Sequence, residues 1–317
     1  MTDTWTWATV TQATPLRIKV DGDTSELDAT TDNLVGSLAV DDRVRVHLHS
    51  DGIIVTGIQG GGNRSNPNLL INSNFMVNQR GYVSGTDLAL NAYGFDRWKA
   101  STATSRMTFT TAPQGQQVTI ASGDSFAQLI ERANVPAGTY TLSWQGTASG
   151  LAVNDGGGAS SAPSPITVTL DGSANVRVLF GPGTLGNVKF ERGSVATPYQ
   201  PKRYDEELPA CRRYYWRTPP GDATLSTAGF QTSTTASRIP ITYSEEMRAT
   251  PTLTYGGALA WTNVTGFLTT VSSLSISLAG RAFCTLSVGF GAEGSGNTVG
   301  LLYSSDGTGY LAFDAEM

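Results

Sequence analysis

The sequence predicts an all-β protein with a single short helix, and two observations lead to that class. Charged residues make up 15% of the 317 residues, whereas roughly a quarter is usual for a soluble protein, and Gly is abundant at 36 residues. Runs of β-branched and aromatic residues are short and are separated by Gly, Asn, Asp and Pro, as in antiparallel strands joined by tight turns. The chain is long enough for two or three domains of ordinary size.

Residues 1–60 predict a small OB-like barrel. In the segment 43–49 apolar side chains alternate with arginine and histidine, which places the apolar side chains on one face of a strand. Asp51 and Gly52 follow, and an Asp-Gly pair between two strand patterns is a strong hairpin signal. About five short strands in this length are typical of such a barrel. Residues 61–67, rich in Gly and Asn, predict a flexible linker.

Residues 68–200 predict a jelly-roll sandwich. Three short strand patterns, at residues 118–120, 138–144 and 166–170, are separated by turn residues. The Gly- and Ser-rich stretch 154–163 is expected to form a long surface loop between two of these strands. Antiparallel strands of this length and spacing are typical of a two-sheet sandwich.

Residues 201–217 predict the one helix, running from Tyr204 to about Trp216. Acidic residues in its first turn and arginines in its last turn complement the helix dipole. Its apolar residues recur at intervals of four, three and four and so form one seam: Tyr204, Leu208, Cys211 and Tyr215. Because a helix this short is marginal alone, we expect the seam to be covered, and three copies of the chain meeting on an axis would bury it.

Residues 218–317 return to strand patterns and predict a C-terminal β-sandwich head. Strands are expected at residues 239–243, 274–278, 284–290 and 310–313. The last of these lies close to residue 317, so the third domain extends to the end of the printed sequence.

Charge and hydropathy exclude several classes of protein. The net charge is −5, so the chain as a whole does not attract nucleic acid or anionic lipid. No apolar run approaches the roughly 18 residues that span a bilayer, and the first residues lack the basic region and apolar core of a secretory signal. Cys211 and Cys284 are too few for a disulfide framework. We therefore expect synthesis in a reducing cytoplasm without a signal peptide, two free thiols and no membrane insertion.

Several stretches of sequence resemble a known class of proteins: 68–75 with 94–98, 126–131 with 137–144, 191–199 with 204–215, 246–252, and 313–317. They resemble the receptor-binding and minor tail proteins of long-tailed bacteriophages. The first two pairs are similar to a carbohydrate-binding-module-like jelly roll, and the third pair is similar to the junction before a trimeric C-terminal head. The resemblance covers most of the chain from residue 68 onward, and the N-terminal barrel resembles, less specifically, a module of Gram-positive phage tail proteins.

This resemblance implies a virion tail protein assembled in the host cytoplasm. Its implied partners are two further copies of the chain, forming a homotrimer, and other tail-tip or baseplate proteins that the N-terminal barrel would contact. It also implies recognition of the host cell surface during adsorption, for which a cell-wall glycan is the expected receptor. The alternatives are a purely structural tail-tip or baseplate subunit and, with less support, a glycan depolymerase.

Two Gly-containing segments of the C-terminal domain contain the residue types that a glycan site needs. Sugar rings pack their C–H faces on exposed aromatic rings, and their hydroxyls bond to Asn, Asp, Ser or Thr. The candidate receptor residues are Tyr255, Trp261, Asn263, Tyr303, Asp306 and Tyr310. In the alternative interpretation Trp261 and Tyr303 belong to the hydrophobic core, as large aromatic residues mostly do, and Tyr255 contacts another subunit.

No motif in the sequence indicates a catalytic, cofactor or metal site. His47 and His49 share a strand face, but a metal site needs at least a third fixed ligand. Asn154 opens a Gly-rich stretch that lacks the ligand spacing of an EF-hand. A structural calcium stays open only as an alternative that the resemblance to module-type jelly rolls implies. The face with His47 also has two arginines, but over residues 1–60 acidic residues outnumber basic ones, and aromatic residues that could stack on bases are not evident there. No carboxylate pair or serine nucleophile stands out. We therefore expect no enzyme, no cofactor and no nucleic-acid partner.

Overall fold

The structure, a computed structural model, describes residues 4–13, 15–28, 32–33, 38, 43–49, 52–58, 66–219, 225–226, 228–266, 268–291 and 297–317. Strands dominate these residues, which confirms the all-β class. The chain divides into two compact units: residues 1–67 with 197–200, and residues 68–196 with 201–317. Most of the linker expected at 61–67 lies outside the described residues.

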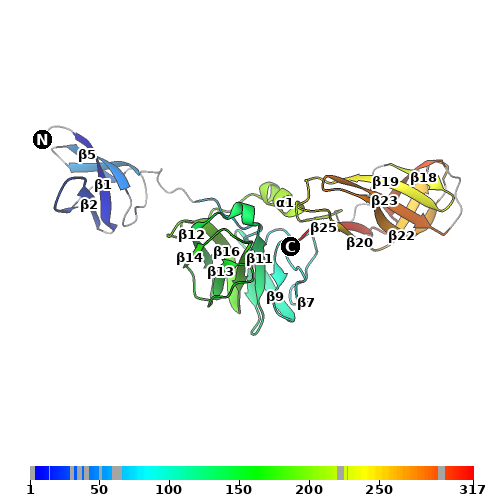
Figure 1. The fold of residues 1–317 in the computed structure, drawn as a ribbon, viewed down its shortest axis with the longest axis horizontal. Helices are drawn as coiled ribbons and strands as arrows, with labels where there is room; N and C mark the ends of the chain where they lie inside the picture. Colours follow the sequence, from blue (N-terminus) through cyan, green and yellow to red (C-terminus); the bar gives the residue numbers. More distant parts are fainter. Residues whose placement is uncertain are drawn as a thin grey trace. The chain divides into compact units, whose positions relative to one another are not determined.

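The first unit contains one six-stranded sheet, in the order β3-β2-β1-β5-β6-β4 (Figure 1). Its strands are β1 (Thr4–Ala13), β2 (Leu16–Val20), β3 (Leu27–Asp28), β4 (Asp32–Asn33), β5 (Arg43–His49) and β6 (Gly52–Ile58). Small apolar side chains such as Ala8, Val10, Val44 and Val46 alternate along β1 and β5 and form the core on one face. Among the described residues these strands pair into one sheet, whose edge strands β3 and β4 are two residues long and pair on one side alone, so the OB-like barrel expected here stays a prediction.

A two-sheet antiparallel sandwich occupies residues 68–196 of the second unit, which confirms the sandwich predicted there. One sheet has the order β14-β12-β16-β10-β9-β7 and contains β7 (Asp87–Ala89), β9 (Thr104–Ala112), β10 (Gly115–Ile120), β12 (Gly138–Gln145), β14 (Ile166–Leu170) and β16 (Gly183–Arg192). The other has the order β13-β15-β11-β8 and contains β8 (Lys99–Ala100), β11 (Phe126–Ile130), β13 (Gly150–Asn154) and β15 (Val176–Phe180). Trp98 and Trp144 lie in the core between the sheets.

The helix α1 (Tyr204–Arg212) starts where predicted but ends four residues early. Tyr215 belongs to the next element instead, strand β17 (Tyr215–Arg217), where it pairs with Asp314. Helix α1 is anchored in its own chain, because the buried Glu207 carboxylate accepts the backbone N–H of Asn72 from the sandwich. No helix among the described residues is long and apolar enough to cross a lipid bilayer.

The C-terminal part of the second unit contains a closed six-stranded barrel, where the sequence predicted a sandwich (Figure 1). The ring order is β18-β19-β23-β22-β21-β24, with β18 (Gly229–Ser233), β19 (Ala236–Thr242), β21 (Leu259–Asn263), β22 (Leu268–Ala279), β23 (Phe283–Phe290) and β24 (Val299–Ser304). Pairing of Gly229 with Gly300 closes the ring. A Cβ atom on Gly300 would lie 2.5 Å from the ring of Trp261, and one on Gly229 would lie 3.1 Å from it. The two glycines therefore leave room for the indole inside the barrel.

A small sheet and a buried group of charges join this barrel to the sandwich. The sheet has the order β17-β25-β20, with β20 (Thr252–Gly256) and β25 (Tyr310–Asp314). Beyond β25, Glu316 forms an ion pair with Arg97 of the sandwich, and both side chains are almost fully buried. Arg80, also from the sandwich, bonds to Asp314 at 3.0 Å. The last residues of the chain are thus built into the sandwich side of the second unit.

Candidate functional site

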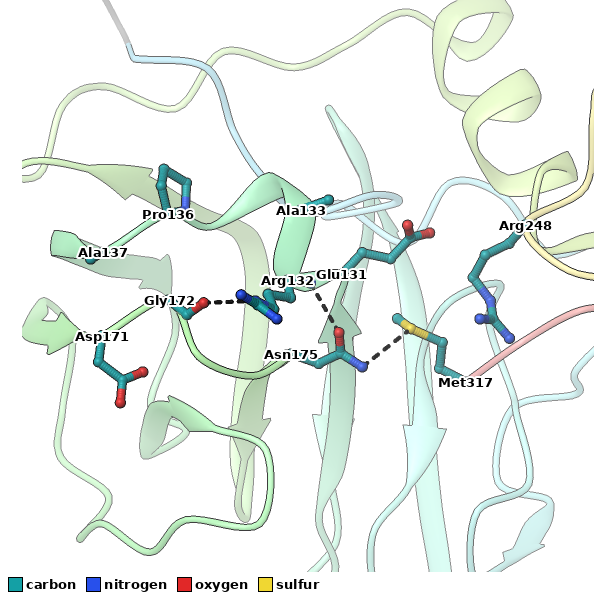
Figure 2. A pocket seen from close by; sticks show the side chains of 10 residues that line it. All are labelled: Glu131, Arg132, Ala133, Pro136, Ala137, Asp171, Gly172, Asn175, Arg248 and Met317. Carbon is teal, nitrogen blue, oxygen red and sulfur yellow. Dashed lines mark hydrogen bonds between the residues drawn. The ribbon is translucent and has the colours of Figure 1, made fainter.

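A hollow of about 820 Å³ lies where loops of the sandwich meet the C-terminal residues (Figure 2). Ten residues line it: Glu131, Arg132, Ala133, Pro136, Ala137, Asp171, Gly172, Asn175, Arg248 and Met317. The first eight come from the loop between β11 and β12 and from the loop between β14 and β15. Segments far apart in the sequence therefore surround one space.

Arg132 ties the two sandwich loops together. Its backbone N–H donates to Oδ1 of Asn175 at 2.9 Å, and its Nε–H donates to the carbonyl of Gly172, also at 2.9 Å (Figure 2). It begins the one-turn 3-10 helix η1 (Arg132–Asn134), which directly follows β11. The bond to Gly172 holds the Arg132 side chain at the rim, where it is still exposed to a ligand in solution.

The opposite wall is the C-terminal segment, and several side chains hold it in place. Arg248 donates through Nε to the carbonyl of Ala315 at 2.7 Å and through a terminal nitrogen to the carbonyl of Glu316 at 2.9 Å. The hydroxyl of Tyr93, from the sandwich, donates to the main-chain oxygen of Met317 at 2.6 Å. This wall is therefore fixed through its backbone.

Both carboxylates at the hollow have lowered pKa values. Burial raises the pKa of Glu131, but the hydroxyl of Tyr214, which donates to it at 2.6 Å, and the guanidinium of Arg213 at 3.3 Å outweigh burial and bring that pKa below its usual value. Ser173 donates its hydroxyl and its backbone N–H to Asp171, and these bonds lower the pKa of Asp171. Both groups are therefore ionised at neutral pH.

These groups suit binding of a ligand with many hydroxyls. Ionised carboxylates and carbonyls accept hydrogen bonds and guanidinium groups donate them, while each sugar hydroxyl can do both. A glycosidase needs one carboxylic acid that stays protonated through a raised pKa, and the pKa values of Glu131 and Asp171 are shifted the other way. The chemistry of the hollow is that of a hydrogen-bonding cradle.

Asp96 has a raised pKa but lies out of reach of a ligand. Burial raises the pKa of Asp96 to about 6, against the effect of Gln79, which donates its backbone N–H at 2.6 Å and its side-chain amide at 2.9 Å. The side chain is fully buried near Arg80 and Glu316 in the junction between sandwich and barrel. Asp96 therefore belongs to the buried junction and not to a ligand site.

Two of the predicted receptor residues lie inside the barrel. Trp261 is fully buried and stacks on Phe290, with 6.2 Å between ring centroids, so its assignment to a receptor surface is wrong and the core interpretation holds. Asn263 is also buried, and its amide nitrogen donates to Thr298 at 3.1 Å and to Gln231 at 3.3 Å. Neither side chain is available to a sugar.

The other four predicted receptor residues do not form one surface. Tyr310 pairs with Gly256, and Tyr255 is the preceding residue of the same strand, so the two rings project from opposite faces of the small sheet. Tyr303 lies on barrel strand β24 opposite Ala260. The Asp306 carboxylate accepts the N–H and the hydroxyl of Thr308 and shapes the turn before β25. Of the predicted aromatics, Tyr255 is the most exposed, at 43%.

The predicted trimer seam is divided between the interior and the surface. Cys211 and Tyr215 are buried within the second unit, so they need no other subunit to cover them. Tyr204 is 54% exposed, and Leu208 is half-buried. Tyr204 and Leu208 line a hollow of about 330 Å³ together with sandwich residues such as Gln79. Only this half of the seam is open to a partner.

The structure also places the residues considered for metal binding. Among the described residues no group of three His, Cys, Asp or Glu side chains could hold a metal ion. His47 packs against Trp5 of the neighbouring strand, so the idea that this face lacks aromatic side chains is wrong. Asn154, which was considered for a calcium ion, donates its side-chain amide to the Asp171 carboxylate at 2.6 Å.

Sequence reasoning did not identify the residues around the 820 Å³ hollow. It treats 126–131, 246–252 and 313–317 only as landmarks of a resemblance, yet these stretches contribute Glu131, Arg248 and Met317 to the lining. Glu131 and Arg248 are charged residues next to a strand end and in a turn, but the convergence of distant segments on one hollow requires the fold. No known protein family matches the chain, and no curated protein has a matching sequence.

Proposed function

We propose that the protein is a non-enzymatic subunit of a bacteriophage tail that recognises the bacterial surface, with a cell-wall glycan as its ligand. The resemblance of residues 68–75, 191–199 and 204–215 to phage tail proteins supports the tail assignment. The observation that carries the binding role is the hollow beside Arg132 and Asp171, because it combines fixed hydrogen-bond donors with two ionised carboxylates.

The two units have different roles in this proposal. The N-terminal sheet attaches the chain to other tail-tip or baseplate proteins, and the second unit contacts the host. Three chains associate through Tyr204 and Leu208, the part of the helix seam that remains open. The chain is made in the host cytoplasm and becomes part of the virion tail.

Binding of the purified full chain to isolated bacterial cell walls tests this function. Arg132→Ala and Asp171→Asn each remove one charged group from the rim, and we expect either change to weaken binding about tenfold, the loss of one charge-assisted bond. Arg106→Ala is the matched control, because Arg106 is an exposed arginine of the sandwich whose ion pair with Asp87 lies away from the hollow. Equal binding by all four proteins would refute the role of the hollow.

A structural role in the tail is the second candidate function. The buried ion pair between Arg97 and Glu316 fixes the sandwich to the barrel, as a spacer that resists bending would require. This candidate would be preferred if the chain enters tails but binds no cell-wall preparation. Release of reducing sugar from a cell wall, retained in Arg132→Ala, would instead indicate a glycan depolymerase.

A further inference from the structure

The outward face of the first sheet carries exposed aromatic and basic side chains in a regular ladder. Strands β1 and β5 are antiparallel, and residues that pair directly project from the same face. Three successive outward pairs form the ladder: Trp5 with His47, Trp7 with Arg45, and Thr9 with Arg43. The residues between them, such as Ala8 and Val44, face the core. The tryptophans come from the first strand and the basic residues from the fifth, so only the strand pairing brings them together.

The ring of Trp5 is held in place by its neighbours on the ladder. The rings of Trp5 and His47 stack with centroids 4.3 Å apart and planes 6° apart. The Arg45 guanidinium lies 5.0 Å from the Trp5 ring centroid. Trp5 is nevertheless 52% exposed and Trp7 39% exposed. Exposed tryptophan is uncommon in a folded protein. A tryptophan that stacking already holds in place loses little further conformational freedom when it binds a ligand.

The two arginines of the ladder differ in what they bind. Arg43 donates both terminal nitrogens of its guanidinium to the carboxylate of Asp21, and one of them also reaches the hydroxyl of Thr9 at 3.0 Å. The exposed Arg45 guanidinium contacts Trp5 and forms no hydrogen bond or ion pair with another side chain of the described residues. Arg45 therefore presents a planar set of N–H donors beside an aromatic platform, the geometry that holds a carboxylate or a phosphate.

We propose that Trp5, Trp7 and Arg45 form a binding site for an acidic oligosaccharide, one that carries uronic-acid or phosphate groups on its sugars. The C–H face of a sugar ring packs on the indole of Trp5 or Trp7. The acidic group of the same or the next sugar accepts hydrogen bonds from Arg45. This site extends the proposed function, because it adds a second sugar-binding surface made of residues that do not line the hollow.

Charge argues against single-stranded nucleic acid as the ligand. Stacking on tryptophan next to arginine suits bases as well as sugars, but a nucleic acid carries one negative charge per nucleotide. Residues 1–58 contain nine acidic residues, and only four basic ones. A unit of this charge repels a dense polyanion, whereas a glycan with isolated acidic groups needs only a single cation such as Arg45.

The small apolar area of this outward face argues against a protein partner at the ladder itself. Two half-exposed indoles present on the order of 200 Å², while a standard protein interface buries roughly 800 Å² on each side. The ladder continues through Thr9 and the paired Arg43, which are polar. The platform matches a disaccharide in extent.

An oligosaccharide array probed with the full chain tests the proposal. The array carries neutral oligosaccharides, their uronic-acid and phosphate-bearing counterparts, and a single-stranded oligothymidylate. We expect binding to at least one acidic oligosaccharide and about tenfold weaker binding to its neutral counterpart. Titration calorimetry with that oligosaccharide then compares variants, where Trp5→Ala and Arg45→Ala should each raise Kd about tenfold.

Matched variants make the outcome decisive. Arg43→Ala removes the same residue type from the same strand face, but its charge is already used by Asp21, so its Kd should stay within about twofold of the wild type. Trp5→Phe keeps a flat ring and should retain most of the affinity, which separates loss of the platform from loss of folding. Oligothymidylate as the sole ligand, no ligand on the array, or equal Kd for wild type, Trp5→Ala and Arg45→Ala would each overturn the proposal. The hollow variants Arg132→Ala and Asp171→Asn test the proposed function separately, so either site can fail alone.

Discussion

At the scale of single residues, Trp261 shows how an exposed-looking aromatic becomes part of a core. In the sequence it stands among small and polar residues, which suggests a loop. In the structure Gly229 and Gly300 pair beside its ring, and their missing side chains provide the space that the indole fills. The sequence shows which residue types surround Trp261 along the chain, but not which distant strands lie next to its ring in the barrel. The burial of Trp261 could therefore not be predicted.

The Trp261→Ala substitution should therefore destabilise the barrel. Loss of a fully buried indole usually costs about 3–5 kcal/mol of unfolding free energy, and the two facing glycines cannot fill the cavity. Chemical denaturation of the full chain measures this loss. Tyr255→Ala serves as control and should change stability by about 0.5 kcal/mol or less, because its ring is largely exposed. Equal small effects of both substitutions would contradict the assignment of Trp261 to the core.

Asp96 should make stability depend on pH. Its pKa rises from 3.8 to about 6 on folding, so the folded protein holds the proton more tightly than the unfolded chain. The stabilising contribution is complete below pH 3.8 and is lost as the pH rises through about 6, a loss on the order of 3 kcal/mol. As the pH rises between these two values, we expect the unfolding free energy of Asp96→Asn to fall less than that of the wild type.

Denaturant melts of both proteins across that pH range provide the measurement. Carboxylates with lowered pKa values, such as Asp306, contribute in the opposite direction, because their stabilisation is lost as the pH falls. They are present in both proteins and cancel in the difference. Asp306→Asn should change the pH dependence with the opposite sign. A pH dependence that Asp96→Asn leaves unaltered would show that Asp96 does not titrate in this range.

At the scale of elements, the segment after β25 fixes the barrel side of the second unit to the sandwich. Glu316→Ala would leave the buried Arg97 without its carboxylate, and breaking a buried ion pair on one side costs about 3–5 kcal/mol. The unfolding free energy of the full chain measures this. Glu246→Ala is the control, because the Glu246–Arg281 pair is exposed and such pairs contribute at most about 1 kcal/mol. If the two substitutions cost the same, the junction does not depend on Glu316.

The bounds of an element could be predicted from the sequence where a local pattern determines them, but not where pairing with a distant strand determines them. The start of α1 at Tyr204 follows from the charges of its first and last turns, and the strand of residues 43–49 follows from alternation; the structure confirms both, although Arg203 and not the acidic Asp205 is the N-cap. The pattern predicts a helix to about Trp216, but α1 ends at Arg212 and Tyr215 pairs instead with Asp314, about a hundred residues away. The closure of the C-terminal barrel likewise depends on a distant pair, Gly229 with Gly300.

At the scale of the whole molecule, the second unit should fold without the first. The cores of its sandwich and its barrel are made only of residues after 68. A protein that starts at residue 67 should therefore keep its melting temperature and, under the proposed function, its trimeric state, but lose incorporation into tails. Calorimetry, light scattering and a reconstitution assay measure the three properties. A misfolded remainder, or one that still enters tails, would contradict the division of roles.

The candidate sites show the same limit at this scale. Residue types suited to a glycan could be recognised in the C-terminal domain, but the structure disperses them over a core, two faces of a sheet and a turn. The hollow gathers Glu131, Asn175 and Met317 from three segments that no spacing rule connects. The ladder of Trp5 and Arg45 likewise requires the register between strands about forty residues apart.

The closed barrel also affects how copies of this protein behave when crowded. A strand at the edge of an open sheet exposes unpaired N–H and C=O groups, to which a strand of another molecule can add. The ring closed by Gly229 and Gly300 has no such strand, and in the first unit the two edges are strands of only two residues, β3 and β4. Neighbouring copies at high local density can therefore touch through their barrels without adding strand to strand at these surfaces.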